Sequence, residues 1–461
     1  MPVRKLIKLT VFIVIIFTLY SCGGASSYSE TTTTSSQETT PPEEPLPLTI
    51  TATVVRIDVL PKLVQIMDML ALPDNSLLVA GYYDEESPTA LSGVSRNGIV
   101  YKIDSSGTLD SSFATGGFLT YGEKEYTTLF NIATTSDGNI FLSGTTGEDF
   151  FSPDQVFVLK LTSDGDIDTT FGTNGIAYHN FTGYDSQSFG MAIQSDGDII
   201  LGCRVTNSQE QRYGLVSFDS NGDLDTSFAT GGAYLSDNLS YISPPVHNVV
   251  VQSDDTIITS METINTFTSQ SASTVTRFTA SGLMDSNFGV GGVLDISQEM
   301  YYRRMLRKQD GQVIVAGTNR QWSSPAGPEV LLHAFSSSGT DDNSFGDHGR
   351  ATINTADNSA TVVNDIKEGP SGRIYFITDI DEFIDQFGDT YRQGIQLVRV
   401  NRNGSLDTLF GDNGKWIYNT ATPEQGRIFA VLPNGTIYIG GMRGDDQIYE
   451  ETLLLKVTIE E

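Results

Sequence analysis

GTLDSSFATGG, residues 107–117, is the first of six copies of an eleven-residue pattern, G-x-x-D-x-x-F-[GA]-x-x-G, which we call the cassette. The other copies keep every fixed position and start at Gly165, Gly222, Gly282, Gly339 and Gly404. Successive cassette phenylalanines lie 57 to 65 residues apart, so one repeating unit has about sixty residues. A period of this length indicates a repeat architecture in which every unit is one small supersecondary element.

Each unit contains two turns and therefore four short strands. The cassette separates two strand-like stretches, for example residues 155–161 and 175–179. A second turn precedes each cassette, and Asp-Gly or Asn-Gly in several copies favours a hairpin because a type I′ turn needs positive φ at both central residues. These turns are residues 73–75, 136–138, 195–197, 253–255, 309–311, 370–372 and 433–435. Four antiparallel strands in about sixty residues predict the blade of a β-propeller.

The numbers of turns and cassettes predict how the two ends of the fold meet. The second turn occurs seven times and the cassette six times, so the last unit supplies only three strands. Residues 48–58 alternate between apolar and polar side chains over most of their length and can supply the fourth. We therefore predict an all-β fold over residues 48–461, a seven-bladed β-propeller of four-stranded antiparallel blades. Its last blade is closed by the N-terminal strand, and six or eight blades are the alternatives.

Composition and charge limit the classes of partner that we expect the protein to bind. The chain has 45 Gly, 24 Phe and 19 Tyr, which suits short strands joined by glycine turns. Its formal charge of −30 repels phosphate, so we expect no nucleic-acid partner. Only two cysteines are present, and Cys203, which follows an apolar stretch, is expected to behave as a small buried hydrophobe.

Residues 1–21 have the features of an export signal. Three basic residues, Arg4, Lys5 and Lys8, precede an apolar run of 12 residues, which is too short to span a bilayer. The next segment, LYSCG around Cys22, resembles the lipobox of bacterial lipoproteins, in which the cysteine is diacylated after cleavage. An ordinary secretory signal that happens to contain a cysteine is the alternative.

The resemblance implies a lipoprotein held at the membrane through Cys22. Residues 22–47 are dominated by Ser, Thr, Glu and Pro, so they predict a disordered tether between the lipid and the propeller. Gly23 follows the cysteine where some inner-membrane lipoproteins have an aspartate, which favours the outer membrane. The expected location is the cell envelope, with the propeller either periplasmic or surface-exposed.

The repeat also resembles a known family. The stretches QDGQVIVAG, residues 309–317, and NGSLDTLFGDNG, residues 403–414, are similar to the delta-60 repeat, a bacterial propeller repeat of uncharacterised function. The resemblance covers residues 61–461, about seven units, and implies a fold without an activity. The sequence departs from the pattern at Asp254-Asp255, where Asp-Gly is expected, and in the last unit, which lacks a cassette.

The constant Asp and Phe of the cassette admit two interpretations. A structural role is favoured, with Asp accepting backbone N–H bonds in the turn and Phe packing between blades. The alternative is calcium, because residues 219–225 place oxygen ligands at alternating positions; no other cofactor is expected. The repeat positions are Asp110, Phe113, Asp168, Phe171, Asp225, Phe228, Asp285, Phe288, Asp342, Phe345, Asp407 and Phe410.

No catalytic motif is present in the sequence. It contains no G-x-S-x-G, no H-E-x-x-H and no phosphate loop, and its four histidines fall in different parts of their units. We therefore assign no catalytic or metal-binding residue and expect a binding scaffold without enzyme activity. A hydrolase or lyase acting on polysaccharide at the mouth of the propeller channel is the alternative.

The longest connections between strands are the expected binding surface. In a four-stranded meander they all emerge on one face, and residues 82–97, 145–154 and 378–394 are rich in acids and aromatics. Variable loops on a rigid scaffold commonly carry binding sites, and this composition suits a protein or glycan partner. Solvated loops without a partner are the alternative. The candidates are Tyr82, Tyr83, Glu85, Asp149, Phe150, Phe151, Asp381, Phe383, Phe387 and Tyr391.

Overall fold

The computed structural model describes residues 48–57, 63–88, 93–148, 153–236, 248–265, 270–296, 300–319, 329–355, 362–384, 390–420, 424–445 and 448–460. These residues form 28 strands and one short 3-10 helix, η1 (Pro370–Gly372). None of the described segments is a helix long and apolar enough to cross a membrane. The predicted signal peptide, Cys22 and the tether lie outside the described residues.

The strands form successive antiparallel groups of four, which we number as units in chain order. Unit 1 is β2 (Gln65–Ala71), β3 (Leu77–Glu86), β4 (Val94–Ile103) and β5 (Phe118–Tyr121), and unit 2 is β6 (Tyr126–Thr134), β7 (Ile140–Gly147), β8 (Pro153–Leu161) and β9 (Ile176–His179). A single parallel bridge between Arg96 and Tyr126 joins these two units into one eight-stranded sheet.

Each later unit is a separate four-stranded sheet. Unit 3 is β10 (Asp185–Ile193), β11 (Ile199–Thr206), β12 (Gln211–Phe218) and β13 (Ala233–Leu235), and unit 4 is β14 (Asn248–Val251), β15 (Ile257–Asn265), β16 (Gln270–Phe278) and β17 (Val293–Asp295). Unit 5 is β18 (Met300–Arg307), β19 (Val313–Asn319), β20 (Val330–Phe335) and β21 (Arg350–Ile353), and unit 6 is β22 (Val363–Glu368), β23 (Ile374–Ile384), β24 (Thr390–Val400) and β25 (Lys415–Asn419). The protein is thus an all-β, propeller-like fold with almost no helix.

The last group takes its fourth strand from the other end of the chain. Unit 7 contains β26 (Glu424–Val431), β27 (Ile437–Asp445) and β28 (Ile448–Glu460), and β1 (Thr49–Val54) completes it. β1 is antiparallel to β28, with Thr49 opposite Glu460 and Val54 opposite Leu455. The strand falls within the predicted residues 48–58 but is shorter than predicted.

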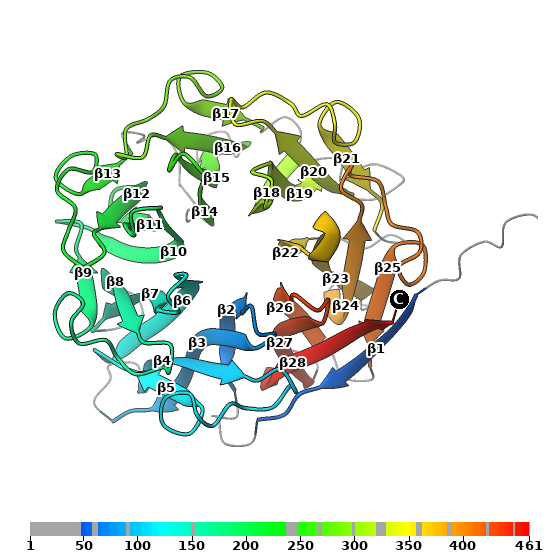
Figure 1. The fold of residues 1–461 in the computed structure, drawn as a ribbon, viewed down its shortest axis with the longest axis horizontal. Helices are drawn as coiled ribbons and strands as arrows, with labels where there is room; N and C mark the ends of the chain where they lie inside the picture. Colours follow the sequence, from blue (N-terminus) through cyan, green and yellow to red (C-terminus); the bar gives the residue numbers. More distant parts are fainter. Residues whose placement is uncertain are drawn as a thin grey trace, which may run out of the picture. The chain divides into compact units, whose positions relative to one another are not determined.

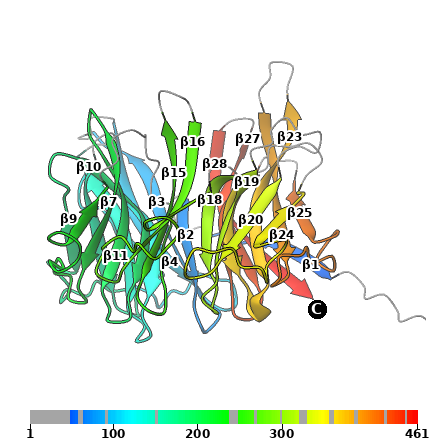
Figure 2. The same cartoon turned by 90° about the horizontal axis from the view of Figure 1, so that it is seen from above.

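The first strand of each unit lies nearest the centre in Figure 1. These inner strands contact one another in the order β2, β6, β10, β14, β18, β22, β26 and back to β2. Side chains reinforce this order, because Asp68 Oδ2 accepts the Ile132 N–H at 2.9 Å and Asp365 Oδ2 accepts the Phe429 N–H at 3.1 Å. In Figure 2 the strands run roughly parallel to the shortest axis of the molecule.

The hydrophobic core lies between neighbouring units, and the cassette builds each junction. All six cassette phenylalanines are at most 2% exposed. Phe113 covers the first glycine of the next cassette so closely that a Cβ on Gly165 would lie 2.7 Å from its aromatic ring. The next residue, Ala114, donates its N–H to Asp164 O at 2.6 Å. Glycine is therefore required at Gly165 both for packing and for its φ of +89°.

The structure corrects the prediction that residues 82–97 form an irregular loop. β3 continues to Glu86 and β4 begins at Val94, so residues 82–86 and 94–97 belong to the paired strands of a hairpin. β7 and β8, and β23 and β24, likewise reach far into the predicted loops 145–154 and 378–394. Cross-strand pairing explains the difference, because polar side chains such as Asp84 and Arg96 bond to each other across the ladder.

Cys203 is a free, fully buried cysteine in β11. Burial raises the pKa of its thiol. The residue therefore packs as the small hydrophobe that the sequence predicts.

Candidate functional site

Tyr82 is engaged in a contact between units 1 and 2. The guanidinium carbon of Arg96 lies 3.8 Å from the centre of the Tyr82 ring and 4.7 Å from that of the Tyr126 ring. Arg96 Nη1 also donates to Tyr126 Oη at 2.6 Å, and its Nε lies 2.6 Å from Asp84 Oδ1. Burial raises the pKa of Tyr82. The aromatic ring of Tyr82 thus helps to hold the two units together.

The structure describes only some of the other predicted partner-binding residues. Tyr83 is half-buried against the core, and Glu85 is exposed and accepts a hydrogen bond from Asn97 Nδ2 at 2.7 Å. On β23 and β24 the ladder pairs Phe383 with Tyr391 and Asp381 with Arg392, whose side chains lie outside the described residues. The remaining candidates, Asp149, Phe150, Phe151 and Phe387, lie outside them altogether.

The cassette aspartates stabilise their own turns. Asp168 Oδ1 accepts the N–H of Thr170 at 3.1 Å and its hydroxyl at 2.5 Å, and Asp168 Oδ2 lies 2.9 Å from Lys160 Nζ. These hydrogen bonds, from Thr170 first and Lys160 second, lower the pKa of Asp168 to about 2. In the other cassettes the Asp Oδ1 accepts the N–H of the residue two positions later, at Ser112, Ser227, Asn287, Ser344 and Leu409.

The predicted calcium loop also consists of ordinary turn contacts. Asp219 Oδ1 accepts the N–H groups of Asn221 and Asp223, both at 2.9 Å. Among the described residues, no group of three His, Cys, Asp or Glu side chains is arranged to hold a metal ion. The sequence analysis missed one feature of the cassettes. In four copies a Lys or Arg eight residues before the cassette Asp forms an ion pair with it. These residues are Lys102, Lys160, Arg277 and Arg399.

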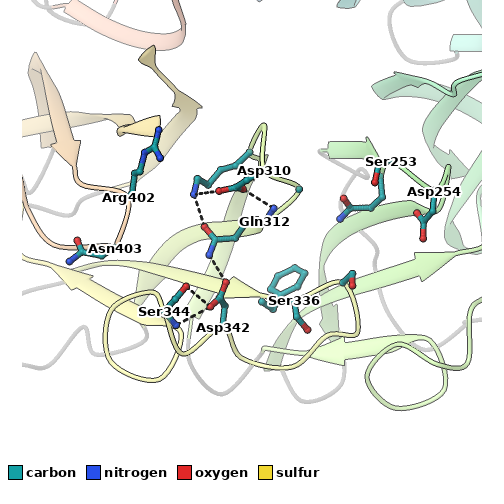
Figure 3. Close-up of a pocket in the computed structure, with 14 residues that line it drawn as sticks. Ser253, Asp254, Asp310, Gln312, Ser336, Asp342, Ser344, Arg402 and Asn403 are labelled. Carbon is teal, nitrogen blue, oxygen red and sulfur yellow. Dashed lines mark hydrogen bonds and ion pairs between the residues drawn. The ribbon is translucent and has the colours of Figure 1, made fainter. Parts of the chain in front are cut away.

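A polar pocket of about 640 Å³ lies where the turns of units 4, 5 and 6 meet (Figure 3). Its walls come from the turns that follow β14, β18 and β24 and from the turn and cassette that follow β20. In an antiparallel meander the hairpin turns and the cassettes share one end of the unit. The pocket therefore lies on the tight-turn face, opposite the long connections where the sequence analysis expects a binding site.

A chain of hydrogen bonds fixes the polar groups on one side of the pocket. Lys308, which is 3% exposed, donates from Nζ to Asp310 Oδ2 and Gln312 Oε1, both at 3.0 Å. Gln312 Nε2 in turn donates to Asp342 Oδ2 at 2.6 Å. Figure 3 shows Gln312 between the two carboxylates of Asp310 and Asp342. Each of these side chains is held in place before any ligand arrives.

Gln252, in the same pocket, has a buried amide nitrogen without a partner. The residue is 8% exposed, and its Oε1 accepts a hydrogen bond from Arg307 Nε at 3.2 Å. Within the described part of the chain, no acceptor bonds to Gln252 Nε2. A buried donor left unpaired costs about 1–3 kcal/mol. A ligand that brings an acceptor to this nitrogen recovers that free energy.

Comparison with Gln194, the equivalent glutamine of unit 3, explains why Gln252 Nε2 has no acceptor. Gln194 Nε2 donates to Asp255 O at 3.0 Å and to Ala280 O at 3.1 Å. The carbonyl equivalent to Ala280 O in the next unit is Ser337 O, and Arg277 Nη1 donates to it instead. The sequence held one hint of this pocket, because Asp254, from the turn that departs from the repeat, lies in its wall.

Comparison with known families supports the fold. A family model described as "Domain of unknown function (DUF5122) beta-propeller" matches residues 72–113, 135–171 and 194–228. The chain is similar to this family. Each match starts near the first turn of a unit and ends at its cassette phenylalanine, at Phe113, Phe171 and Phe228. The resemblance therefore links units 1 to 3 to a β-propeller family of unknown function, and no curated protein matches the chain.

Solved structures give only distant likenesses. The aldose sugar dehydrogenase of Streptomyces coelicolor is 10% identical with a TM-score of 0.39, and the alignment covers 72% of this chain and 94% of that one. The polysaccharide lyase Uly1 is 11% identical with a TM-score of 0.44, covering 85% and 89%. The β-propeller domain of the Trilobed protease from Pyrococcus furiosus is 8% identical with a TM-score of 0.44, covering 86% and 95%. Identities this low carry no information about activity.

Proposed function

We propose that the protein is an exported, lipid-anchored binding scaffold built as a seven-bladed β-propeller. The grouping of the described strands in fours and the circular order of contacts among their inner strands support the blade number. The pairing of β1 with β28 supports closure of the last blade by the N-terminal strand. Closure protects the sheet edges that an open array would leave unpaired.

The anchor and the location are parts of the same proposal. Cys22 carries the lipid, residues 22–47 form the tether, and the propeller is held at the outer membrane, facing either the periplasm or the exterior. The basic and apolar segments of residues 1–21 and the lipobox-like LYSCG support this part. Cleavage at Cys22 places the acyl chains directly before the tether, and two or more chains give stable attachment.

The ligand that the pocket of units 4 to 6 fits best is a saccharide. The observation that carries the proposal is the unpartnered Gln252 Nε2, which needs an acceptor. Asp310 and Asp342, in the same pocket, present carboxylates that accept hydrogen bonds. A sugar hydroxyl both accepts and donates, so one polyhydroxylated molecule satisfies both kinds of group. The volume of about 640 Å³ lies within the range of small-molecule sites.

The long-connection face is a second contact surface in this proposal, for a protein or glycan partner. The cross-strand pair of Phe383 and Tyr391 supports it, because it brings two aromatic residues together near the end of one hairpin. Tyr82 is used within the molecule, so Phe150 and Phe151 are better candidates there than Tyr82.

The proposal is tested by a carbohydrate array with the delipidated propeller, residues 48–461, and by comparing two glutamine variants. We expect Gln252→Leu to weaken saccharide binding about fivefold to tenfold, since one hydrogen bond of about 1 kcal/mol is lost. Its melting temperature should change little, because removal of a buried unpaired donor offsets the loss of the hydrogen bond from Arg307 Nε. Gln194→Leu, at the matched position outside the pocket, should leave binding unchanged.

Two outcomes contradict this assignment. Absence of binding to any array member removes the saccharide proposal, and binding that is equally strong in Gln252→Leu removes the pocket as its site. Turnover of a bound polysaccharide, measured on the same array hits by release of reducing ends or unsaturated products, supports the hydrolase or lyase alternative instead.

A further inference from the structure

The second oxygen of the cassette aspartate has a nitrogen donor in five of the six cassettes. In units 2 and 4 the donor is a basic residue on the third strand, Lys160 or Arg277. In unit 5, where Ala334 holds that position, Gln312 from the second strand donates instead. The donors are Lys102 at 3.2 Å, Lys160 at 2.9 Å, Arg277 at 2.6 Å, Gln312 at 2.6 Å and Arg399 at 2.9 Å. A positive or N–H group at this place is thus part of the repeat.

Unit 3 lacks a donor at both of these positions. Strand register identifies the equivalents: Lys160 pairs with Phe141 and Ser217 pairs with Ile200, so Ser217 stands where Lys160 stands in unit 2. Asp198, two residues before Ile200, stands where Gln312 stands in unit 5. The aspartate of this cassette, Asp225, therefore faces a hydroxyl and a second carboxylate in place of a cation and an amide.

The hydroxyl of Ser217 is buried and has no partner. The residue is 0% exposed, and its Oγ forms no hydrogen bond within the described residues. Cross-strand partners share a face of the sheet, as do residues two apart on one strand, so Ser217 lies on the face of Asp198. On this face the Lys160 side chain of unit 2 reaches its cassette carboxylate. The buried oxygen thus belongs to the residue that stands where Lys160 stands in unit 2, on the same face of the sheet.

The charges around this place repel one another. Burial, followed by the charges of Asp196, Asp225 and Asp219, raises the pKa of Asp198 to about 6. By contrast, hydrogen bonds from Thr170 first and Lys160 second lower the pKa of the cassette residue Asp168 in unit 2. Asp198 has carboxylates near it and no ion pair within the described residues, and both burial and like charge raise the pKa of a carboxyl group.

We propose that a calcium ion takes the place of the missing nitrogen in unit 3, held between the carboxylates of Asp198 and Asp225 with Ser217 Oγ facing it. The donor set is all oxygen, which suits a hard cation, and water completes the coordination shell. With two carboxylates in a partly exposed site, the affinity falls in the range of extracellular calcium modules, about 10⁻⁴ to 10⁻³ M. This site is separate from the saccharide pocket and does not depend on it.

The test measures calcium binding and thermal unfolding of the propeller after treatment with EDTA. Isothermal titration with CaCl2 should show one site in the wild type, and about 10 mM calcium should raise its melting temperature by about 1–3 °C. Ser217→Lys supplies the nitrogen that Lys160 supplies in unit 2. This variant should lose the calcium site and melt above the wild type in EDTA.

Two further variants keep the outcome decisive. Asp198→Asn should lose calcium binding while staying folded, because it removes one ligand and also the repulsion. Lys160→Ser removes the cation of unit 2, where Asn139 stands at the position of Asp198, and should gain no calcium site. The proposal is overturned if the wild type binds no calcium in this range, or if binding persists in both Ser217→Lys and Asp198→Asn, as it would for diffuse attraction to an acidic surface. A larger response to MgCl2 than to CaCl2 would overturn the choice of ion.

Discussion

Units 3 and 4 have the same order of four strands, and a difference at one position of the third strand has two consequences. The third strand carries Ser217 in unit 3 and Arg277 in unit 4. Arg277 neutralises the cassette carboxylate of Asp285 at 2.6 Å, stands over the Phe288 ring at 5.2 Å, and also donates to Ser337 O. With serine there, Asp225 has no cation partner in the described structure, and Gln194 bonds to the carbonyl equivalent to the one that Arg277 takes.

The residue at this position of the third strand changes which polar groups of a junction lack a partner. In unit 2, for example, Lys160 lies 2.9 Å from the cassette carboxylate of Asp168, so that carboxylate has a counter-charge. In unit 3 the departure leaves carboxylates without a counter-charge, whereas in unit 4 Arg277 leaves Gln252 Nε2 without an acceptor. The residue at this one position therefore determines whether a junction leaves carboxylates without a counter-charge or a glutamine amide without an acceptor.

The largest expected effect comes from Arg277→Ser, which gives unit 4 the residue of unit 3. Arg277 and Asp285 are 11% and 12% exposed, so the change leaves a largely buried carboxylate unpaired. We expect a loss of about 3 kcal/mol in the free energy of unfolding, measured by guanidinium denaturation. Saccharide binding should fall as well, because Ser337 O becomes available to Gln252. A stability within 0.5 kcal/mol of wild type, roughly the range of an ordinary surface substitution, would contradict the comparison.

A smaller effect is expected when the two glutamines are compared for stability. Gln194→Leu removes two hydrogen bonds to backbone carbonyls and should lower the free energy of unfolding by about 1–2 kcal/mol. Gln252→Leu removes an unpaired donor and one hydrogen bond from Arg307, so it should change the free energy of unfolding little. The urea denaturation midpoints of the two variants provide the measurement, and equal losses would show that the two side chains have the same environment.

The smallest expected effect concerns pH. The pKa of Asp198 is raised in the folded protein, so the native state binds more protons than the unfolded one between about pH 4 and 6, and stability falls as the pH rises through this window. Asp198→Asn should therefore stabilise the calcium-free protein at about pH 7.5 and not at about pH 4. Solvent screening limits the gain to about 1 kcal/mol or less.

Asp285 serves as a control, because its pKa is shifted in the opposite direction from that of Asp198. Hydrogen bonds from the Asn287 N–H and from Arg277 lower its pKa, so it stabilises the protein at neutral pH and that contribution is lost as the pH falls below about 4. Melting curves of Asp198→Asn and wild type across this range, recorded in EDTA, make the comparison. A stabilisation by Asp198→Asn that is equal at both ends of the range would contradict the assigned cause.

The strand pattern and the turns could be predicted from the sequence because they depend on local chemistry. The predicted strand 175–179 is β9, and the predicted 155–161 lies within β8. The turns lie where they were predicted, but the type I′ geometry was wrong: Gly138 and Gly197 have positive φ, whereas Asp137 and Asp196 before them do not. The extended hairpins at residues 82–97 were missed, since polar residues such as Asp84 and Glu85 are typical of loops unless partners such as Arg96 and Asn97 stand opposite.

The pocket could not be predicted in the same way. Whether Gln252 is satisfied depends on Arg277, on a different strand, and on Ser337, which belongs to the next unit. Two donors compete for one carbonyl, and the sequence does not show which one reaches it. A position-by-position comparison of the units would have found the substitution of Ser217 for Lys or Arg, but not its effect on Gln194.

The junction between the last and first units has a consequence for the order of folding. Elsewhere a cassette phenylalanine covers the next glycine about fifty residues away, but Gly107 meets Tyr438 and Lys456, and Lys456 Nζ bonds to Ser106 O across 350 residues of chain. Contacts so distant in sequence form slowly, because the ends must find each other before the interaction contributes. During synthesis units 1 to 6 can assemble in order, but β1 stays unpaired until β28 has been made. Until then β1 presents an unpaired edge, which other strands can add to.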